Sequence, residues 1–191
     1  MNIQFFLEKL KGSDEFKKFK KENPKSYLTS CFITVDIEGK EKNNQYHLDF
    51  FVPTTLKTKD ELGTWWSFKL ENGIELEQLQ KMDMKDVKFE EIPDFIKNPP
   101  KITAKSTIEF DEIQRLIQEE MDKKNITNKI QKILMVLQRQ TGSGEVEKYI
   151  CTVFISGLGI LKVIIEDAND GGGKVLFFEK KSFFDMLRKS K

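Results

Sequence analysis

The chain offers few side chains that could carry out chemistry. His47 is its only histidine, which excludes metal sites built from several histidines and the two-histidine motifs of metalloproteases. It lies on the less apolar side of an alternating segment, where an ordinary surface histidine is favoured over a catalytic one. We therefore expect no histidine-based catalysis and no enzyme activity.

The two cysteines do not form a reactive pattern. Cys31 and Cys151 each lie within an alternating apolar segment and there is no Cys-x-x-Cys motif. Thiols buried among Val, Ile and Phe are inert. The pattern favours free thiols in a reducing compartment, and a disulfide between the two cysteines is the alternative.

Glycines and carboxylates near the C-terminus suggest phosphate or cation binding only superficially. The run Gly171–Lys174 has Val175 where a phosphate loop requires Ser or Thr, and it precedes a strand, so a hairpin turn is favoured. Glu166, Asp167 and Asp170 lack the spacing of a calcium loop, and a solvated turn is favoured over a cation site. We expect no cofactor and no metal.

Aromatic residues supply the best candidate binding site. Trp65 and Phe51 point to the less apolar side of their strands, on the same side as His47. Such aromatics can stack on bases or hold a peptide. The alternative is that the connecting segment or the rest of the chain covers them. We take Trp65, Phe51 and His47 as the predicted binding residues.

Composition limits the class of partner. The 32 Lys and Arg nearly balance the 31 Asp and Glu, giving a formal net charge of +1. Only Arg115, Arg139 and Arg188 are arginines, which disfavours a nucleic-acid reader without excluding one. No stretch approaches the roughly 18 apolar residues of a membrane span, and the N-terminus does not have the pattern of a signal peptide. We expect a cytoplasmic protein that does not enter membranes.

The elements that position these residues follow a repeated order. A helix over residues 3–10, restarting at Ser13 or Asp14, precedes strands near 27–37, 46–52 and 65–70, and Asn72-Gly73 predicts a hairpin to a strand over 74–79. A second helix ends at Met121 and precedes strands near 130–137, 149–155, 161–165 and 174–178. The spacing predicts an α+β fold of two tandem repeats, each an N-terminal helix packed on a curved antiparallel sheet of three to four strands.

The Pro-rich segment between the two halves predicts their boundary, with one unit at 1–97 and the other at 98–191. The strands of the second half are apolar on both faces, which is typical of strands covered on both sides. The second face of these strands could be covered by the first unit, by the middle segment, or by another copy of the chain in a homodimer. Residues 182–188 have the pattern of a short amphipathic helix.

The hairpin from Leu161 to Phe177, with Tyr149 in the strand before it, resembles the closing hairpin of PepSY domains. In the first half Tyr46 and Asn72-Gly73 match the same pattern. The related cystatin-like group has the same helix-on-sheet packing. The resemblance implies a helix-plus-antiparallel-sheet fold and non-catalytic interaction with proteins or peptides.

The hypothesis from the sequence is therefore a non-catalytic interaction or regulatory module that binds a protein or peptide. The first alternative is a binder of small apolar ligands between helix and sheet, suggested by the 16 Phe residues. The second is a single-stranded nucleic-acid binder that uses Trp65, Phe51 and neighbouring lysines.

Overall fold

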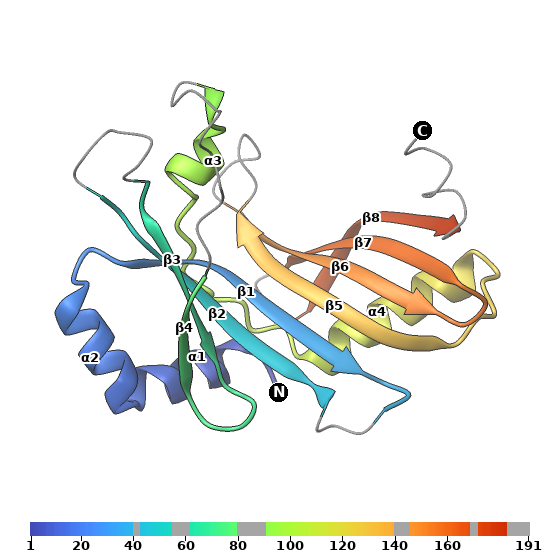
Figure 1. Cartoon of the computed structure of the whole chain (residues 1–191). Helices are drawn as coiled ribbons and strands as arrows, with labels where there is room; N and C mark the ends of the chain where they lie inside the picture. The colour runs from blue at the N-terminus through green and yellow to red at the C-terminus, as the bar shows by residue number, and fades with distance from the viewer. Residues whose placement is uncertain (40–42, 55–61, 80–90, 140–145, 169–171, 183–191) are drawn as a thin grey trace.

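The computed structural model describes residues 1–39, 43–54, 62–79, 91–139, 146–168 and 172–182 (Figure 1). Within these ranges the helices are α1 (Ile3–Gly12), α2 (Asp14–Glu22), α3 (Asp94–Lys97) and α4 (Phe110–Lys123). The strands are β1 (Tyr27–Asp36), β2 (Gln45–Val52), β3 (Thr64–Lys69), β4 (Glu75–Gln78), β5 (Ile130–Arg139), β6 (Glu147–Ile155), β7 (Gly159–Asp167) and β8 (Gly173–Ser182).

The strands form one antiparallel sheet in the order β4-β3-β2-β1-β5-β6-β7-β8. Each group of four is a meander in which consecutive strands are neighbours. The two meanders join where β1 pairs with β5, with Cys31 opposite Leu137 and Ile33 opposite Met135. The predicted α+β class with antiparallel strands is confirmed, and the sheet continues without a break from the first half of the chain into the second.

Helices α1, α2 and α4 lie on one face of this sheet, behind it in Figure 1. Because apolar residues recur at helical spacing, each long helix presents one apolar stripe to the strands. The buried residues of these stripes are Ile3, Phe6, Leu7 and Leu10 in α1, and Phe110, Ile113, Ile117 and Met121 in α4. We call the opposite face of the sheet the open face.

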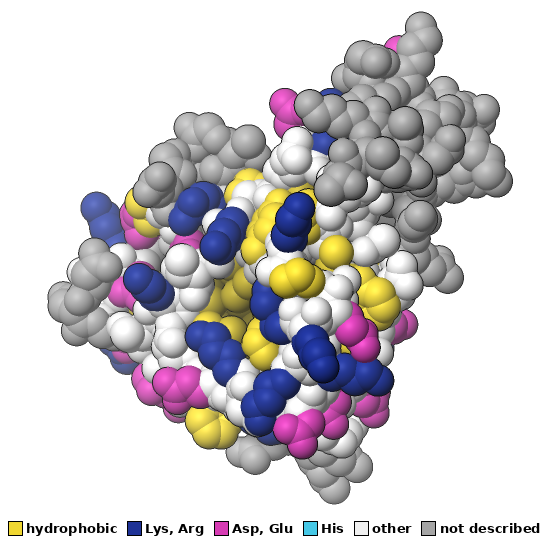
Figure 2. Space-filling model, turned by 90° about the vertical axis from the view of Figure 1, so that its left-hand side faces the viewer, with side chains coloured by type: hydrophobic (Ala, Val, Ile, Leu, Met, Phe, Trp, Pro, Cys, Tyr) yellow, Lys and Arg dark blue, Asp and Glu magenta, His cyan; other side chains and the backbone are white. Residues whose placement is uncertain are grey.

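The predicted break between the first two helices is confirmed at Ser13. Its hydroxyl accepts a hydrogen bond from the Phe16 amide at 3.1 Å, and its own amide donates to the Leu10 carbonyl at 2.9 Å. One residue therefore ends α1 and caps α2. Helix α2 then packs through Phe19, whose ring centroid lies 5.2 Å from that of Phe68. Figure 2 shows the molecule from the side at which α2 lies in Figure 1. On this side, basic and acidic side chains surround a hollow lined by hydrophobic side chains.

The connection between the meanders crosses from the open face to the helix side. After α3, the amide of Ile102 donates to the Leu28 carbonyl at 2.9 Å, beside a bulge at the start of β1. Beyond this point Ile102, Ala104 and Ile108 are buried in the core. Helix α3 was not predicted, because four residues are too few to show a helical period.

The second meander is apolar on both faces, as predicted, but only one face is covered in the described part of the chain. Most helix-side residues of β6 and β7 are buried, whereas the alternate residues are half-buried or, at Lys162, exposed. None of the described helices lies over these alternate residues. The predicted amphipathic segment 182–188 lies almost entirely outside the described residues, since only Ser182 belongs to them.

Two leucines of β5 test this difference between the faces. Leu137 lies on the helix side with 1% of its surface exposed, and Leu134 lies half-buried on the open face. We expect Leu137→Ala to lower the free energy of unfolding by about 2–5 kcal/mol. Leu134→Ala should cost less than about 1.5 kcal/mol, because its side chain is still partly hydrated. Urea denaturation of both variants measures this, and equal losses would mean that the open face is covered.

Candidate binding site on the open face

The three predicted residues lie on the open face, but not together at one point. The register places Tyr27, Phe51 and Trp65 in one row across β1, β2 and β3, and Phe32, His47 and Lys69 in another. Between these rows lies a third, formed by Ser30, Asp49 and Ser67. The pattern of alternation therefore assigned the three residues to the correct face, and a polar row separates His47 from the two aromatics.

Phe51 lies beneath its aromatic neighbours. Only 1% of its surface is exposed, and its ring centroid lies 5.4 Å from that of Trp65 and 5.7 Å from that of Tyr27. The edge-to-face arrangement stabilises the pair beyond the area that it buries. Phe51 can therefore support the position of Trp65 but presents almost no surface to a partner.

Trp65 lies beside the segment that connects the two meanders. Phe95, Pro99 and Pro100 of this segment line a shallow pocket with Trp65, and the Tyr27 hydroxyl donates to the Pro99 carbonyl at 3.1 Å. The pocket has a volume of 330 Å³, and its remaining lining residues are Thr29, Ser30, Gln138 and Arg139. The alternative from the sequence is that the connecting segment or the rest of the chain covers these aromatics. In the structure the connecting segment lies beside Trp65, which stays partly exposed.

Asp49 occupies the middle of the polar row. Its carboxylate accepts a hydrogen bond from the Ser30 hydroxyl at 2.9 Å and another from the Ser67 hydroxyl at 2.8 Å. Ser67 is itself buried. Both serine hydroxyls are therefore hydrogen-bonded to one carboxylate, which links the open-face sides of β1, β2 and β3.

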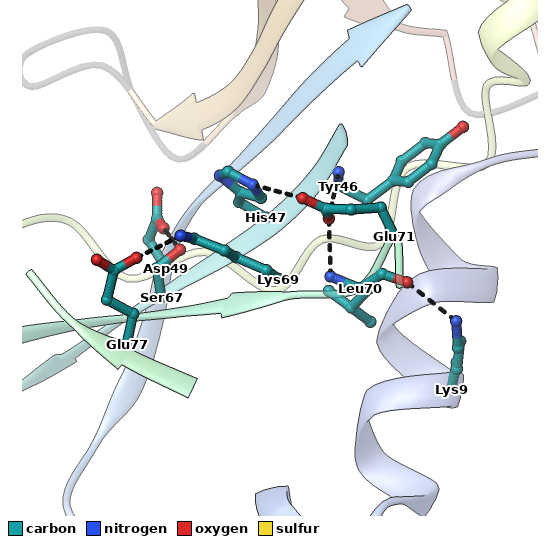
Figure 3. A network of polar contacts seen from close by, with 9 residues as sticks. All are labelled: Lys9, Tyr46, His47, Asp49, Ser67, Lys69, Leu70, Glu71 and Glu77. Atoms are coloured by element: carbon teal, nitrogen blue, oxygen red, sulfur yellow. Dashed lines mark hydrogen bonds and ion pairs between the residues drawn. The ribbon is translucent and has the colours of Figure 1, made fainter. Parts of the chain in front are cut away.

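His47 belongs to a polar network at the end of β2 and β3 (Figure 3). Its Nε2 lies 3.2 Å from Oε1 of Glu71, while Oε2 of Glu71 accepts from the amides of Leu70 at 3.0 Å and Tyr46 at 3.4 Å. Partial burial opposes the charged form of Glu71, but its own backbone amide, His47 and the Tyr46 amide outweigh it, and the pKa of Glu71 is lowered. The network ties the loop after β3 to β2.

Neighbouring lysines extend this network at both ends. Lys69 pairs with Glu77 of the edge strand β4 at 2.5 Å, and this hydrogen bond raises the pKa of Lys69. From the other side of the sheet, Lys9 of α1 donates to the Leu70 carbonyl at 3.1 Å. His47 thus lies among groups that are already hydrogen-bonded to one another, which is typical of a structural cluster.

The two cysteines lie in the core of the sheet. Cys31 and Cys151 are free thiols, each fully buried. Burial raises the pKa of Cys151 to about 12, and burial together with Asp49 and Glu147 raises that of Cys31 well above its ordinary value. In the described part of the chain no three potential ligands group around a metal position, and no helix there is long and apolar enough to span a membrane.

The largest apolar feature of the open face was not among the predicted site residues. One row of the register runs through Phe32, Val136, Ile150, Ile164 and Phe177, on β1, β5, β6, β7 and β8. We call these five residues the open-face row. The two-sided apolar pattern of the later strands signalled it, but which of the two sides the helices cover depends on the fold.

In comparisons with known proteins, no family model, no curated protein and no solved structure matches the chain. The resemblance to PepSY and cystatin-like domains therefore stays a prediction, as do the binding roles of Trp65, Phe51 and His47.

The Glu71 carboxylate gives the stability of the protein a pH dependence. Because its pKa is lower in the folded chain than its ordinary value of 4.5, it stabilises the fold above that value, and this stabilisation is lost as the pH falls through the folded pKa. We expect Glu71→Gln to destabilise the protein at neutral pH and the difference from wild type to shrink in acid. Denaturant titrations at both pH values measure this, and a difference that does not change with pH would contradict it.

The thiols provide a second test. In the native protein neither Cys31 nor Cys151 should react with a thiol-specific reagent such as dithionitrobenzoate, because both are buried and protonated. After unfolding in guanidinium chloride both should react. Rapid modification of either thiol without unfolding would show that its strand opens or that the thiol is activated.

Proposed function

We propose that this protein is a non-catalytic interaction module that binds a protein or peptide through the open face of its sheet. The observation that carries the proposal is the open-face row, five apolar side chains on five neighbouring strands that no described helix covers. Phe177 is exposed and the other four side chains are half-buried. Contiguous apolar surface with a polar rim is typical of interaction sites.

The surroundings of the row support a protein or peptide rather than a polyanion. On the open face Lys148 lies opposite Glu166, and Lys162 lies opposite Glu179. Because these charges alternate in sign, they create no extended positive field for nucleic acid. They form a charged margin beside the apolar row, which is the arrangement of an interface core and rim.

The absence of catalytic function is part of the proposal. It is supported by the histidine held by Glu71, the serines held by Asp49 and the buried thiols. We also propose a cytoplasmic location, since two buried free thiols fit a reducing compartment.

We further propose that the two halves are tandem copies of one helix-plus-sheet unit. Each half begins with helical structure, continues as a meander of four strands, and contributes its first strand to the central antiparallel pair. Two like units related by a two-fold axis would pair their first strands in this antiparallel manner.

A selection from a library of random peptides tests the binding function. Peptides selected on the wild-type protein should bind Ile150→Lys and Ile164→Lys at least about tenfold more weakly, since each charge would be buried in the contact. Leu158→Lys is the matched control, because Leu158 lies in the turn after β6 with 62% of its surface exposed. Fluorescence anisotropy with the labelled peptides measures each affinity.

A Trp65→Ala variant separates the two parts of the open face. If Trp65→Ala loses binding but Ile150→Lys and Ile164→Lys do not, the peptide binds in the pocket beside Trp65 and not on the open-face row. Failure to select any peptide above background, or equal affinity for all variants, would contradict the proposed function.

A further inference from the structure

Strand β8 is the one long edge of the sheet in the described part of the chain. It contains ten residues and is the last strand in the sheet order, and no described strand pairs with its outer side. Such an edge offers a row of backbone donors and acceptors to another strand. At the opposite edge, β4 has only four residues, two of them glutamates, and is poorly suited to pairing.

A bulge divides β8 into two parts with opposite alternation. Ile164 lies opposite Phe177 and Ile165 lies opposite Val175, so Leu176 is the extra residue. Before the bulge Lys174 lies on the open face with Glu166. After it Glu179 lies on the open face with Lys162. The even-numbered residue Lys174 therefore lies on the open face before the bulge, whereas the odd-numbered residues lie on the open face after it.

We propose that β8 pairs antiparallel with β8 of a second copy of the chain, in a symmetric register centred on the bulge. In this register Lys174 lies opposite Glu179, Val175 opposite Phe178, and Leu176 opposite Phe177 of the other copy. Each opposed pair occurs twice because the contact is symmetric.

The shift of alternation at Leu176 makes this register consistent on both faces. Lys174 and Glu179 are both on the open face, whereas Val175 and Phe178 are both on the helix side. The register therefore brings together two pairs of opposite charges and four apolar pairs, which are the contacts that stabilise neighbouring strands. In a strand that kept its regular alternation through Leu176, this register would place each open-face side chain opposite a helix-side one.

Exposure at the centre of the strand agrees with this pairing. Leu176 and Phe177 each have 41% of their surface exposed, although both are large and apolar. Pairing would bring each against the other across the new contact. It would also extend the open-face row from Phe177 onto the second copy, forming one continuous apolar surface.

Lysines and bulges can also protect an edge strand against pairing. In β8, however, the charges are complementary under two-fold symmetry, and Glu179 forms an exposed ion pair with Lys181 at 3.0 Å that it could exchange for the new contact. Because the same edge is used by both copies, the contact closes as a dimer and does not continue as a filament.

Charge reversal tests the register. By sedimentation equilibrium the wild-type protein should show twice the mass of the 22.4 kDa chain. Lys174→Glu places glutamates opposite glutamates, and Glu179→Lys places lysines opposite lysines. Each variant alone should raise the dimer dissociation constant at least about tenfold, since two cross-strand pairs turn from attractive to repulsive. An equimolar mixture should regain the dimer, because the glutamate introduced in one variant then lies opposite the lysine introduced in the other.

The control is Lys17→Glu on α2, which changes the net charge by the same amount as Lys174→Glu. The Lys17 side chain is 62% exposed, and this variant should leave the dimer unchanged. A chain carrying both Lys174→Cys and Glu179→Cys should form a disulfide-linked dimer on oxidation, which tests the register independently of charge. Circular dichroism confirms that each variant is folded.

A wild-type protein that stays monomeric at micromolar concentrations would overturn the proposal. So would a dimer that neither reversal weakens, or a mixture that stays monomeric. The outcome is independent of the proposed peptide binding, because Ile150→Lys lies on β6 and should leave the dimer intact. Failure of one proposal is therefore distinguishable from failure of the other.

Discussion

The antiparallel pair of β1 and β5 is the contact on which the rest of the fold depends. It lies at the centre of the sheet. On its other side, β1 pairs with β2 of the first meander and β5 pairs with β6 of the second. Its register sets Cys31 opposite Leu137 and Ile33 opposite Met135, so the buried faces of both meanders point the same way. The helices of both halves must then pack on one side of the sheet, since that side carries the apolar surface of every strand they contact. A shift of one residue in this pair would turn one meander over.

The same constraint leaves the opposite face without a long helix in the described part of the chain, where only the four-residue α3 lies beside it, near Trp65. In the first meander that face is occupied by groups that bond to one another: Asp49 with its two serines, and Glu71 with His47 and two backbone amides. In the second meander it consists largely of aliphatic and aromatic side chains set between opposed Lys and Glu. The open face therefore has a polar half and an apolar half, joined where Phe32 meets His47 at a ring distance of 5.9 Å.

Local patterns predicted much of the fold. Alternation in β2 and β3 correctly placed His47, Phe51 and Trp65 on one face, and Ser13 and Asn72-Gly73 marked a helix cap and a hairpin that the structure contains. Two features could not follow from such patterns. The burial of Phe51 depends on Tyr27 and Trp65, which lie far from it in sequence, and alternation reports the side of a strand but not what approaches it. The neighbours of β5 were also undetermined, since apolar residues on both faces give no sign of which strand pairs with which.

For the proposed binding function, desolvation favours the apolar half of the open face as the contact surface. A partner that covered Asp49, Glu71 or the Lys69–Glu77 pair would remove water from charged groups, and the loss would have to be matched by new hydrogen bonds. Covering the open-face row removes apolar area from water at a gain of about 25 cal/mol per Å² and requires no such match. The two meanders therefore have the same strand layout but differ in the side chains of their open faces. The first half uses the open face for internal bonds that fix its strands and loops, and in the second half none of the described helices covers that face.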